Sequence, residues 1–186
     1  TQREVYRKVA ETSRSGWEFN QARVINLKDE LGLSGYGLDL GLRAYFISTN
    51  EEFADYSPGQ ILQLTYKQNK HHWSESNARE MQYLYMAHVD RIIDGDTLQV
   101  TIHCGFGILR KQRLRLRGVD TPERGTTEGN RIHEWVENEL RSCPEIAIRT
   151  FRTDKYDRYV ADVIYGLGAK DRDELLTTGN SLNTKL

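Results

Sequence analysis

Cysteine, proline and methionine are scarce in this chain. Its 186 residues include two cysteines, three prolines and two methionines. Cys104 and Cys143 do not provide the disulfide framework of small secreted domains, and neither has a second ligand at the spacing of a zinc site. We therefore expect each cysteine to be a small buried or half-buried residue.

Long apolar runs are missing as well. No segment approaches the roughly 18 apolar residues of a membrane-spanning helix, and no signal-peptide pattern opens the chain. The sequence therefore predicts no membrane partner and leaves the cellular compartment unknown.

The chain also lacks a surplus of one charge. Its formal net charge is -1, so no overall positive field attracts it to nucleic acid. Affinity for a polyanion must come from a local cluster. The densest basic cluster consists of Arg110, Lys111, Arg113, Arg115 and Arg117.

The remaining composition, with 38% hydrophobic and 28% charged residues, is ordinary for a soluble globular protein. A polar stretch from Gln68 to Arg79 is the best candidate for a linker, so we predict two domains, 1–84 and 85–186. For residues 1–84 we expect a small mixed α/β or mostly helical domain of unknown function, in which targeting or binding of a protein partner stays open. Its expected elements are a helix over Gln2–Ser13, one or two strands over Trp17–Leu27, and apolar segments over Leu40–Ile47 and Ile61–Tyr66.

A turn signal followed by a strand signal stands near the start of the second domain. Asp94, Gly95 and Asp96 are typical turn residues. After them Leu98, Val100 and Ile102 alternate with polar residues, which indicates a half-buried strand. We therefore expect Asp96 to lie in the turn that enters this strand.

A second strand carries a row of arginines. Leu114 and Leu116 alternate with Arg113, Arg115 and Arg117, and successive side chains point to opposite faces of a sheet. The segment Asp120-Thr121-Pro122-Glu123 then leaves the strand as a turn, since proline cannot continue a central strand.

These residue types fit the hydrolysis of a phosphodiester. The reaction needs a cation near the phosphate, a carboxylate that orients or deprotonates a water molecule, and fixed positive donors for the developing charge. Asp96, Asp120 and Glu123 supply carboxylates, while Arg115 and Arg158 supply guanidinium groups that match phosphate oxygens in a bidentate manner.

Three motifs, in the same order, resemble those of the staphylococcal (micrococcal) nuclease family, also called thermonuclease. They are the Asp-Gly-Asp-Thr turn ending at Thr97, the Arg-x4-Asp-Thr-Pro-Glu stretch from Arg115 to Glu123, and the Thr-Asp-Lys-Tyr-x-Arg run ending at Arg158. The resemblance covers residues 85–186. It implies a calcium-dependent nuclease of low sequence specificity that acts on DNA and/or RNA and leaves 3′-phosphate ends.

The resemblance also implies a role for each matching residue. Asp96, Asp120 and the backbone carbonyl of Thr121 would hold one Ca2+, and Glu123 would be the general base or would orient the water molecule. Arg115 and Arg158 would clamp the scissile phosphate. Lys155 and Tyr156 match residues that contact a neighbouring phosphate.

The fold that the resemblance implies is of the α+β class: a five-stranded OB-fold barrel with packed helices. Periodicity is consistent with a helix over Arg131–Leu140, strands over Glu145–Phe151 and Tyr159–Tyr165, and a short helix over Asp171–Thr178. We expect His133, on the first of these helices, to serve in packing or to lie at the surface.

Alternatives stay open at several positions. Asp94 is either a turn residue, which we favour, or a support for the metal site, and Arg113 and Arg117 are either nucleic-acid contacts or a solvated strand face, which we also favour. The segment Lys67–Trp73 suits contacts with single strands but is more typical of an exposed linker. At the level of function, the alternative is a non-catalytic module of the same fold that binds nucleic acid or protein.

Overall fold

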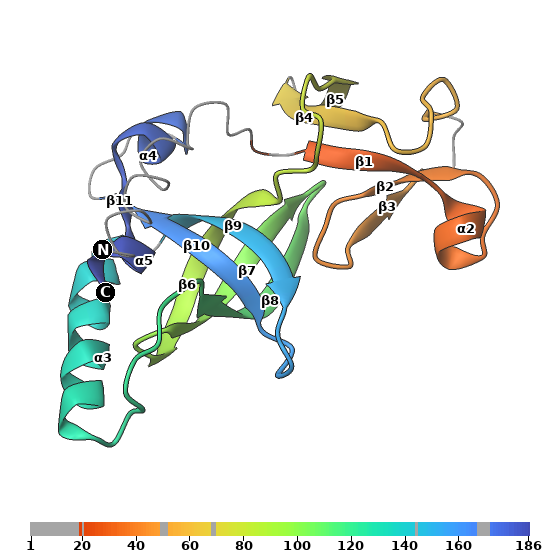
Figure 1. The fold of residues 1–186 in the computed structure, drawn as a ribbon. Helices are drawn as coiled ribbons and strands as arrows, with labels where there is room; N and C mark the ends of the chain where they lie inside the picture. Colours follow the sequence, from red (N-terminus) through yellow and green to blue (C-terminus); the bar gives the residue numbers. More distant parts are fainter. Residues whose placement is uncertain (1–18, 20, 49–51, 68–69, 144, 167–171) are drawn as a thin grey trace. The chain divides into compact units, whose positions relative to one another are not determined.

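The computed structural model describes residues 19, 21–48, 52–67, 70–143, 145–166 and 172–186. The helix predicted over Gln2–Ser13 lies outside them. The chain divides into two compact units (Figure 1). The sheet unit comprises Glu18–Tyr83 and His103–Leu109, and the barrel unit contains Leu84–Ile102 and Arg110–Leu186.

The sheet unit is built on five antiparallel strands and one short helix. The strand order is β3-β2-β1-β4-β5, and every recorded pairing is antiparallel. The elements are β1 (Gln21–Asn26), α2 (Leu27–Leu31), β2 (Tyr36–Asp39), β3 (Tyr45–Ile47), β4 (Ile61–Lys67) and β5 (Lys70–Glu75).

Two predictions for this unit are wrong. The domain expected to be mixed α/β or mostly helical is, in its described part, an antiparallel sheet with a single helix of five residues, α2. The linker predicted over Gln68–Arg79 contains β5, which pairs with β4 from Leu62 opposite Glu75 onward. Because β5 is an edge strand, it is held by backbone pairing while side chains such as His72 remain exposed.

Aromatic and aliphatic side chains form the core of the sheet unit. Val24, Leu38 and Leu62 are fully buried. The ring of buried Phe53 lies 5.1 Å from that of Trp73 on β5. The aromatic residue of the supposed linker therefore packs into this core.

The barrel unit is a five-stranded mixed β-barrel with few helices (Figure 1). Its strands follow the order β10-β8-β7-β6-β9, and pairing between β9 and β10 closes the barrel. β8 and β10 are parallel. The strands are β6 (Leu84–Asp94), β7 (Thr97–Gly105), β8 (Ile108–Leu116), β9 (Glu145–Thr153) and β10 (Tyr159–Tyr165), and the two-residue strand β11 (Asn180–Ser181) pairs with β10.

The strand and helix predictions for this unit are confirmed. Leu98, Val100 and Ile102 of β7 and Leu114 and Leu116 of β8 are buried, while the polar residues between them, Gln99, Thr101 and Arg115, are half-buried. The helices are α3 (Thr127–Leu140), α4 (Arg172–Thr178) and α5 (Leu182–Lys185).

Helix α3 packs against β6 through an apolar face that includes Val136 and Leu140. His133 is buried on the same face, and its Nε2 atom lies 3.3 Å from the carbonyl oxygen of Ile92. The predicted packing role of His133 is confirmed.

Cys143, just after α3, is buried with a free thiol, as is Cys104 on β7, which confirms the prediction for both cysteines.

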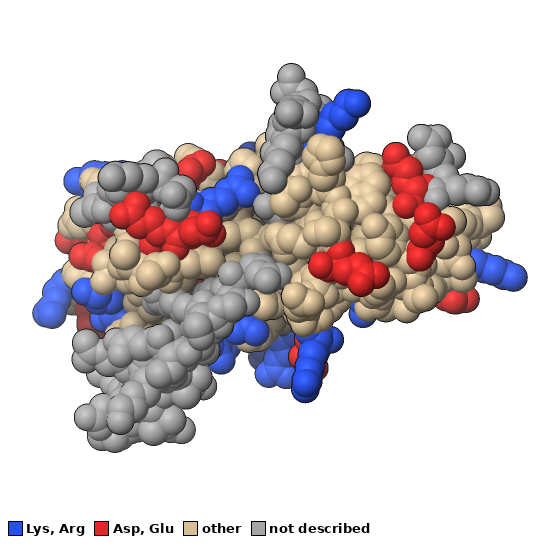
Figure 2. Space-filling model, turned by 90° about the horizontal axis from the view of Figure 1, so that it is seen from above, with Lys and Arg blue, Asp and Glu red and all other residues tan. Residues whose placement is uncertain are grey.

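On the face drawn in Figure 2, the acidic and basic side chains of the described residues form small separate groups. No helix in the described ranges is long and apolar enough to cross a membrane.

Candidate active site

The turn between β6 and β7 places Asp96 at the end of the barrel. Gly95 has no room for a side chain, because a Cβ atom there would lie 2.5 Å from Cγ2 of Ile132 on α3. The carbonyl oxygen of Asp96 accepts a hydrogen bond of 2.8 Å from the backbone N–H of Leu116 at the end of β8. Two stretches that are distant in sequence therefore meet at Asp96.

The carboxylate of Asp96 is buried and saturated with donors. It accepts hydrogen bonds of 2.9 Å from the backbone N–H of Thr121 and from Oγ1 of Thr97, and it forms an ion pair with Arg115. Burial alone would raise the pKa of Asp96, but the Thr121 N–H and the Arg115 guanidinium outweigh burial and hold this pKa below its ordinary value. Asp96 is thus a preorganised anion.

Arg115 joins two carboxylates. One terminal nitrogen pairs with Asp96, and the other, Nη2, donates a hydrogen bond of 2.7 Å to Oδ1 of Asp120. The Asp120 side chain is 95% exposed, whereas that of Arg115 is 21% exposed. Burial would lower the pKa of Arg115, but the two carboxylates raise it above its ordinary value. The predicted metal ligands Asp96 and Asp120 therefore already share one cation.

Arg158 approaches the same place from the turn between β9 and β10. Its Nη1 atom lies 3.2 Å from Oγ1 of Thr97, the residue next to Asp96. Asp154 fixes this arginine: its Oδ2 accepts from Nε of Arg158 at 2.8 Å, and its Oδ1 accepts from the backbone N–H groups of Tyr156 and Arg158 at 2.9 and 3.0 Å. The carboxylate of Asp154 therefore shapes the whole turn.

We expect the Asp154→Asn variant to be about 1–2 kcal/mol less stable than the wild type at neutral pH, since a charge-assisted hydrogen bond is lost. Burial would raise the pKa of Asp154, but the backbone hydrogen bonds and the guanidinium of Arg158 lower it. A carboxyl group whose pKa is lower in the folded state stabilises the fold. This stabilisation is fully present at pH values above the unfolded-state pKa of about 3.9, and it disappears as the pH falls through the folded-state pKa.

Urea unfolding at a series of pH values measures this effect. The gap between wild type and Asp154→Asn should be widest at neutral pH and should close in acid, while Glu134→Gln, at an exposed position of α3, should show no gap. A gap that persists undiminished below the folded-state pKa would contradict this role of Asp154.

Lys155 and Tyr156 form the exposed tip of the turn. Tyr156 is 58% exposed. The Lys155 ammonium and the Arg158 guanidinium lie 4.9 and 5.2 Å from the centre of its ring. An aromatic ring flanked by two cations is suited to contact phosphates or bases.

Glu123 is placed through its backbone. Its carbonyl oxygen accepts a hydrogen bond of 2.9 Å from Oγ1 of Thr126, the residue that caps α3. Gly129 in the first turns of α3 makes this approach possible, because a Cβ atom at that position would overlap the Glu123 carbonyl. The Glu123 side chain is exposed, and its carboxylate has no hydrogen-bond partner among the described residues.

The donor set suits one hard cation. Carboxylate and carbonyl oxygens are the ligands that Ca2+ prefers, and the shared Arg115 guanidinium marks the space beside Asp96 and Asp120 as one that attracts positive charge. Within the described ranges no three side chains of the Asp, Glu, His or Cys type are grouped as a metal site. A cation here would therefore rely on two carboxylates, a backbone carbonyl such as that of Thr121, and water.

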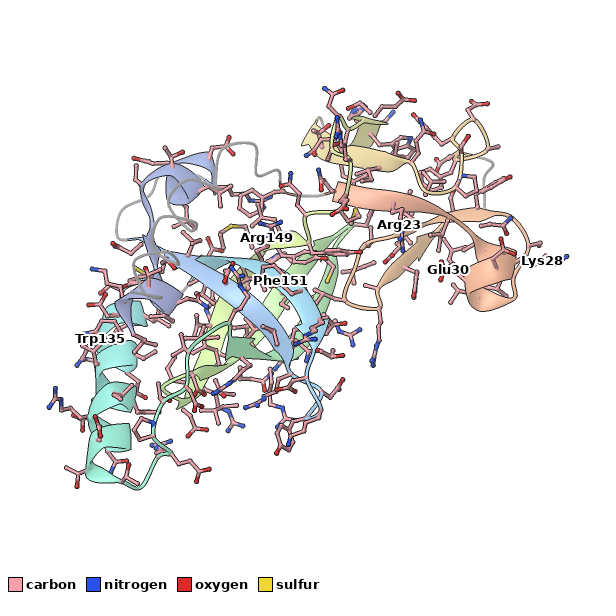
Figure 3. All side chains as sticks on the ribbon, viewed as in Figure 1. Arg23, Lys28, Glu30, Trp135, Arg149 and Phe151 are labelled. Carbon is pink, nitrogen blue, oxygen red and sulfur yellow. The ribbon has the colours of Figure 1, made fainter. Side chains whose placement is uncertain are left out.

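Sequence reasoning missed two contributors and favoured a solvated strand face for Arg117, whereas the guanidinium of Arg117 is paired in the fold. Thr97 and Asp154 belong to the recognised motifs, but their contacts with Arg158 become visible only in the fold. Arg117 forms two hydrogen bonds with Asp162, of 2.8 and 2.7 Å, and its guanidinium lies 4.5 Å from the centre of the Phe151 ring. Phe151 lies on β9, the strand that also carries Arg149 (Figure 3). Arg117 thus links neighbouring strands.

No family model matches the chain, and no curated protein matches it.

Proposed function

We propose that this chain is a calcium-dependent nuclease that hydrolyses phosphodiester bonds of DNA and/or RNA with low sequence specificity and leaves 3′-phosphate ends. One observation carries the proposal. The guanidinium of Arg115 bridges Asp96 and Asp120, while Arg158 reaches Thr97 beside them. Two carboxylates and two arginines from three separate segments thus converge on one place, which is the arrangement that phosphodiester chemistry needs.

The proposed roles follow from burial and charge. Asp96, Asp120 and the carbonyl of Thr121 would hold Ca2+, which when bound neutralises phosphate charge and polarises the phosphorus centre. The carboxylate of Glu123, which is exposed and has no hydrogen-bond partner among the described residues, is suited to orient a water molecule and accept its proton.

The two arginines stabilise the charge that develops on the phosphate. Arg115 exchanges a carboxylate oxygen for a phosphate oxygen, because its planar group offers several donors. Arg158 is held by Asp154 through Nε, and its Nη1 atom is directed toward Thr97. Its fixed position reduces the reorganisation needed when charge builds up.

The barrel supports the same proposal. Three consecutive strands, β6, β7 and β8, lie side by side, and β10 then lies between β8 and β9. Helix α3 connects the third strand to the fourth. We infer from this five-stranded Greek-key order that the barrel is of the OB type, a fold that often binds oligonucleotides.

Cleavage of labelled single-stranded DNA and RNA tests this function. We expect cleavage in Ca2+ and no cleavage when EDTA replaces the metal. The products should be joined by a ligase to a 5′-phosphorylated oligonucleotide only after their 3′-phosphates have been removed. Binding of both nucleic acids without cleavage in any metal would instead favour the non-catalytic binding module.

A further inference from the structure

The basic residues from Lys111 to Arg117, on β8 and directly after it, differ in how many partners their side chains have. Arg115 is paired with two carboxylates, and Arg117 is paired with Asp162. The contact recorded for the Arg113 guanidinium is 3.4 Å long and goes to the carbonyl oxygen of Tyr156, beyond the usual length of an N–H···O hydrogen bond. The ammonium group of Lys111 has no ion pair or hydrogen bond to a described residue. Both of these side chains are exposed.

We propose that Lys111 and Arg113 form a phosphate-binding subsite on β8, which holds the backbone of a single-stranded nucleic acid next to the phosphate bound by Arg115. This subsite rests on the proposed function, since Arg115 marks the scissile position. It assigns to Arg113 the role of a substrate contact and leaves Arg117 as a structural residue.

The spacing along β8 supports the subsite. Gln112, Leu114 and Leu116 are buried, so Lys111, Arg113 and Arg115 share the opposite face. Residues two apart on a strand are separated by about 6.6 Å, twice the rise per residue. A row of cations at this interval resembles the repeat of phosphates along one extended backbone.

The neighbouring turn supports a single strand as the ligand. Nε2 of Gln112 donates a hydrogen bond of 2.9 Å to the carbonyl oxygen of Asp157, which holds the β9–β10 turn against β8. Arg113 therefore lies beside Tyr156, whose ring is exposed. Exposed aromatic rings next to a cationic row suit strands with unpaired bases, because such bases can stack while the phosphates pair with the cations.

The salt dependence of binding measures the subsite without any cleavage. Fluorescein-labelled oligothymidylates of increasing length are titrated in EDTA, with fluorescence anisotropy as the signal. Lys111→Gln and Arg113→Gln should each reduce the slope of log K against log salt by about 0.7, the value for one phosphate contact on a single strand. The matched control is Arg131→Gln, at an exposed position of α3, which should leave the slope unchanged.

The outcomes separate this subsite from the proposed function. If the wild type cleaves in Ca2+ but the two β8 variants keep its slope, the subsite is overturned and the nuclease stands. If the slope falls as expected and the wild type cleaves nothing, the subsite is supported and the nuclease is overturned. Equal slope losses in Arg113→Gln and Arg131→Gln would show an effect of net charge and would also overturn the subsite.

Discussion

Replacing Arg115 by lysine is expected to lower the rate of phosphodiester cleavage by at least ~100-fold, which is typical of the loss of one transition-state donor. Lysine keeps the positive charge but has no planar fork, so it cannot contact two phosphate oxygens in the bidentate manner of arginine. Nor can a single ammonium readily reproduce the bridge between Asp96 and Asp120. Single-turnover rates with saturating enzyme measure the effect on the chemical step.

A conservative control belongs with this variant. Arg131→Lys changes the same residue type at an exposed position of α3 and should retain the wild-type rate. Thermal unfolding of both variants shows whether they are folded at the assay temperature. Wild-type turnover in Arg115→Lys would eliminate the role assigned to Arg115.

The two proposed carboxylate ligands should respond differently to removal of their charge. Asp96→Asn is expected to lose about 2–3 kcal/mol of stability, because a buried acceptor of charged and backbone donors is weakened. Asp120→Asn should leave the free energy of unfolding unchanged, because an exposed ion pair contributes little. Both variants should nevertheless bind Ca2+ at least about tenfold more weakly. Mutation of a residue that only supports a metal ligand already costs about tenfold in affinity, and loss of a ligand itself should cost at least as much.

Isothermal titration with Ca2+ and urea unfolding together test this pair. The informative result is a shared loss of metal affinity combined with a loss of stability in Asp96→Asn alone. If Asp120→Asn binds Ca2+ as the wild type does, Asp120 is not a ligand, and its hydrogen bond to Arg115 would be its only remaining function at this site.

The strands of the barrel unit could be predicted because apolar and polar residues alternate along them in the sequence. Leu98, Val100 and Ile102 mark β7 as plainly in sequence as in the fold. β5 was not predicted, because its residues do not alternate in this way. As an edge strand it is held by backbone pairing with β4, and its polar residues resemble those of a linker.

In the candidate site, too, one part could be predicted from the sequence and another could not. The residue types at Asp96, Arg115 and Asp120 could be recognised in sequence, but the bridge formed by Arg115 could not. That bridge depends on the hydrogen bond from the backbone N–H of Leu116 to the carbonyl oxygen of Asp96, which holds the end of β8 next to the β6–β7 turn. The structural role of Arg117 depends on Asp162, which lies on another strand, so alternation alone could not distinguish it from Arg113.

The most direct test compares wild type with Glu123→Gln on one single-stranded oligonucleotide in Ca2+, measuring both cleavage and binding. The variant should fold normally, because the exposed carboxylate of Glu123 has no structural partner among the described residues. We predict a loss of cleavage of roughly 100-fold or more, the usual contribution of a general base, with binding retained. Cleavage by Glu123→Gln at the wild-type rate would contradict the proposed site, even if the wild type proved to be a nuclease.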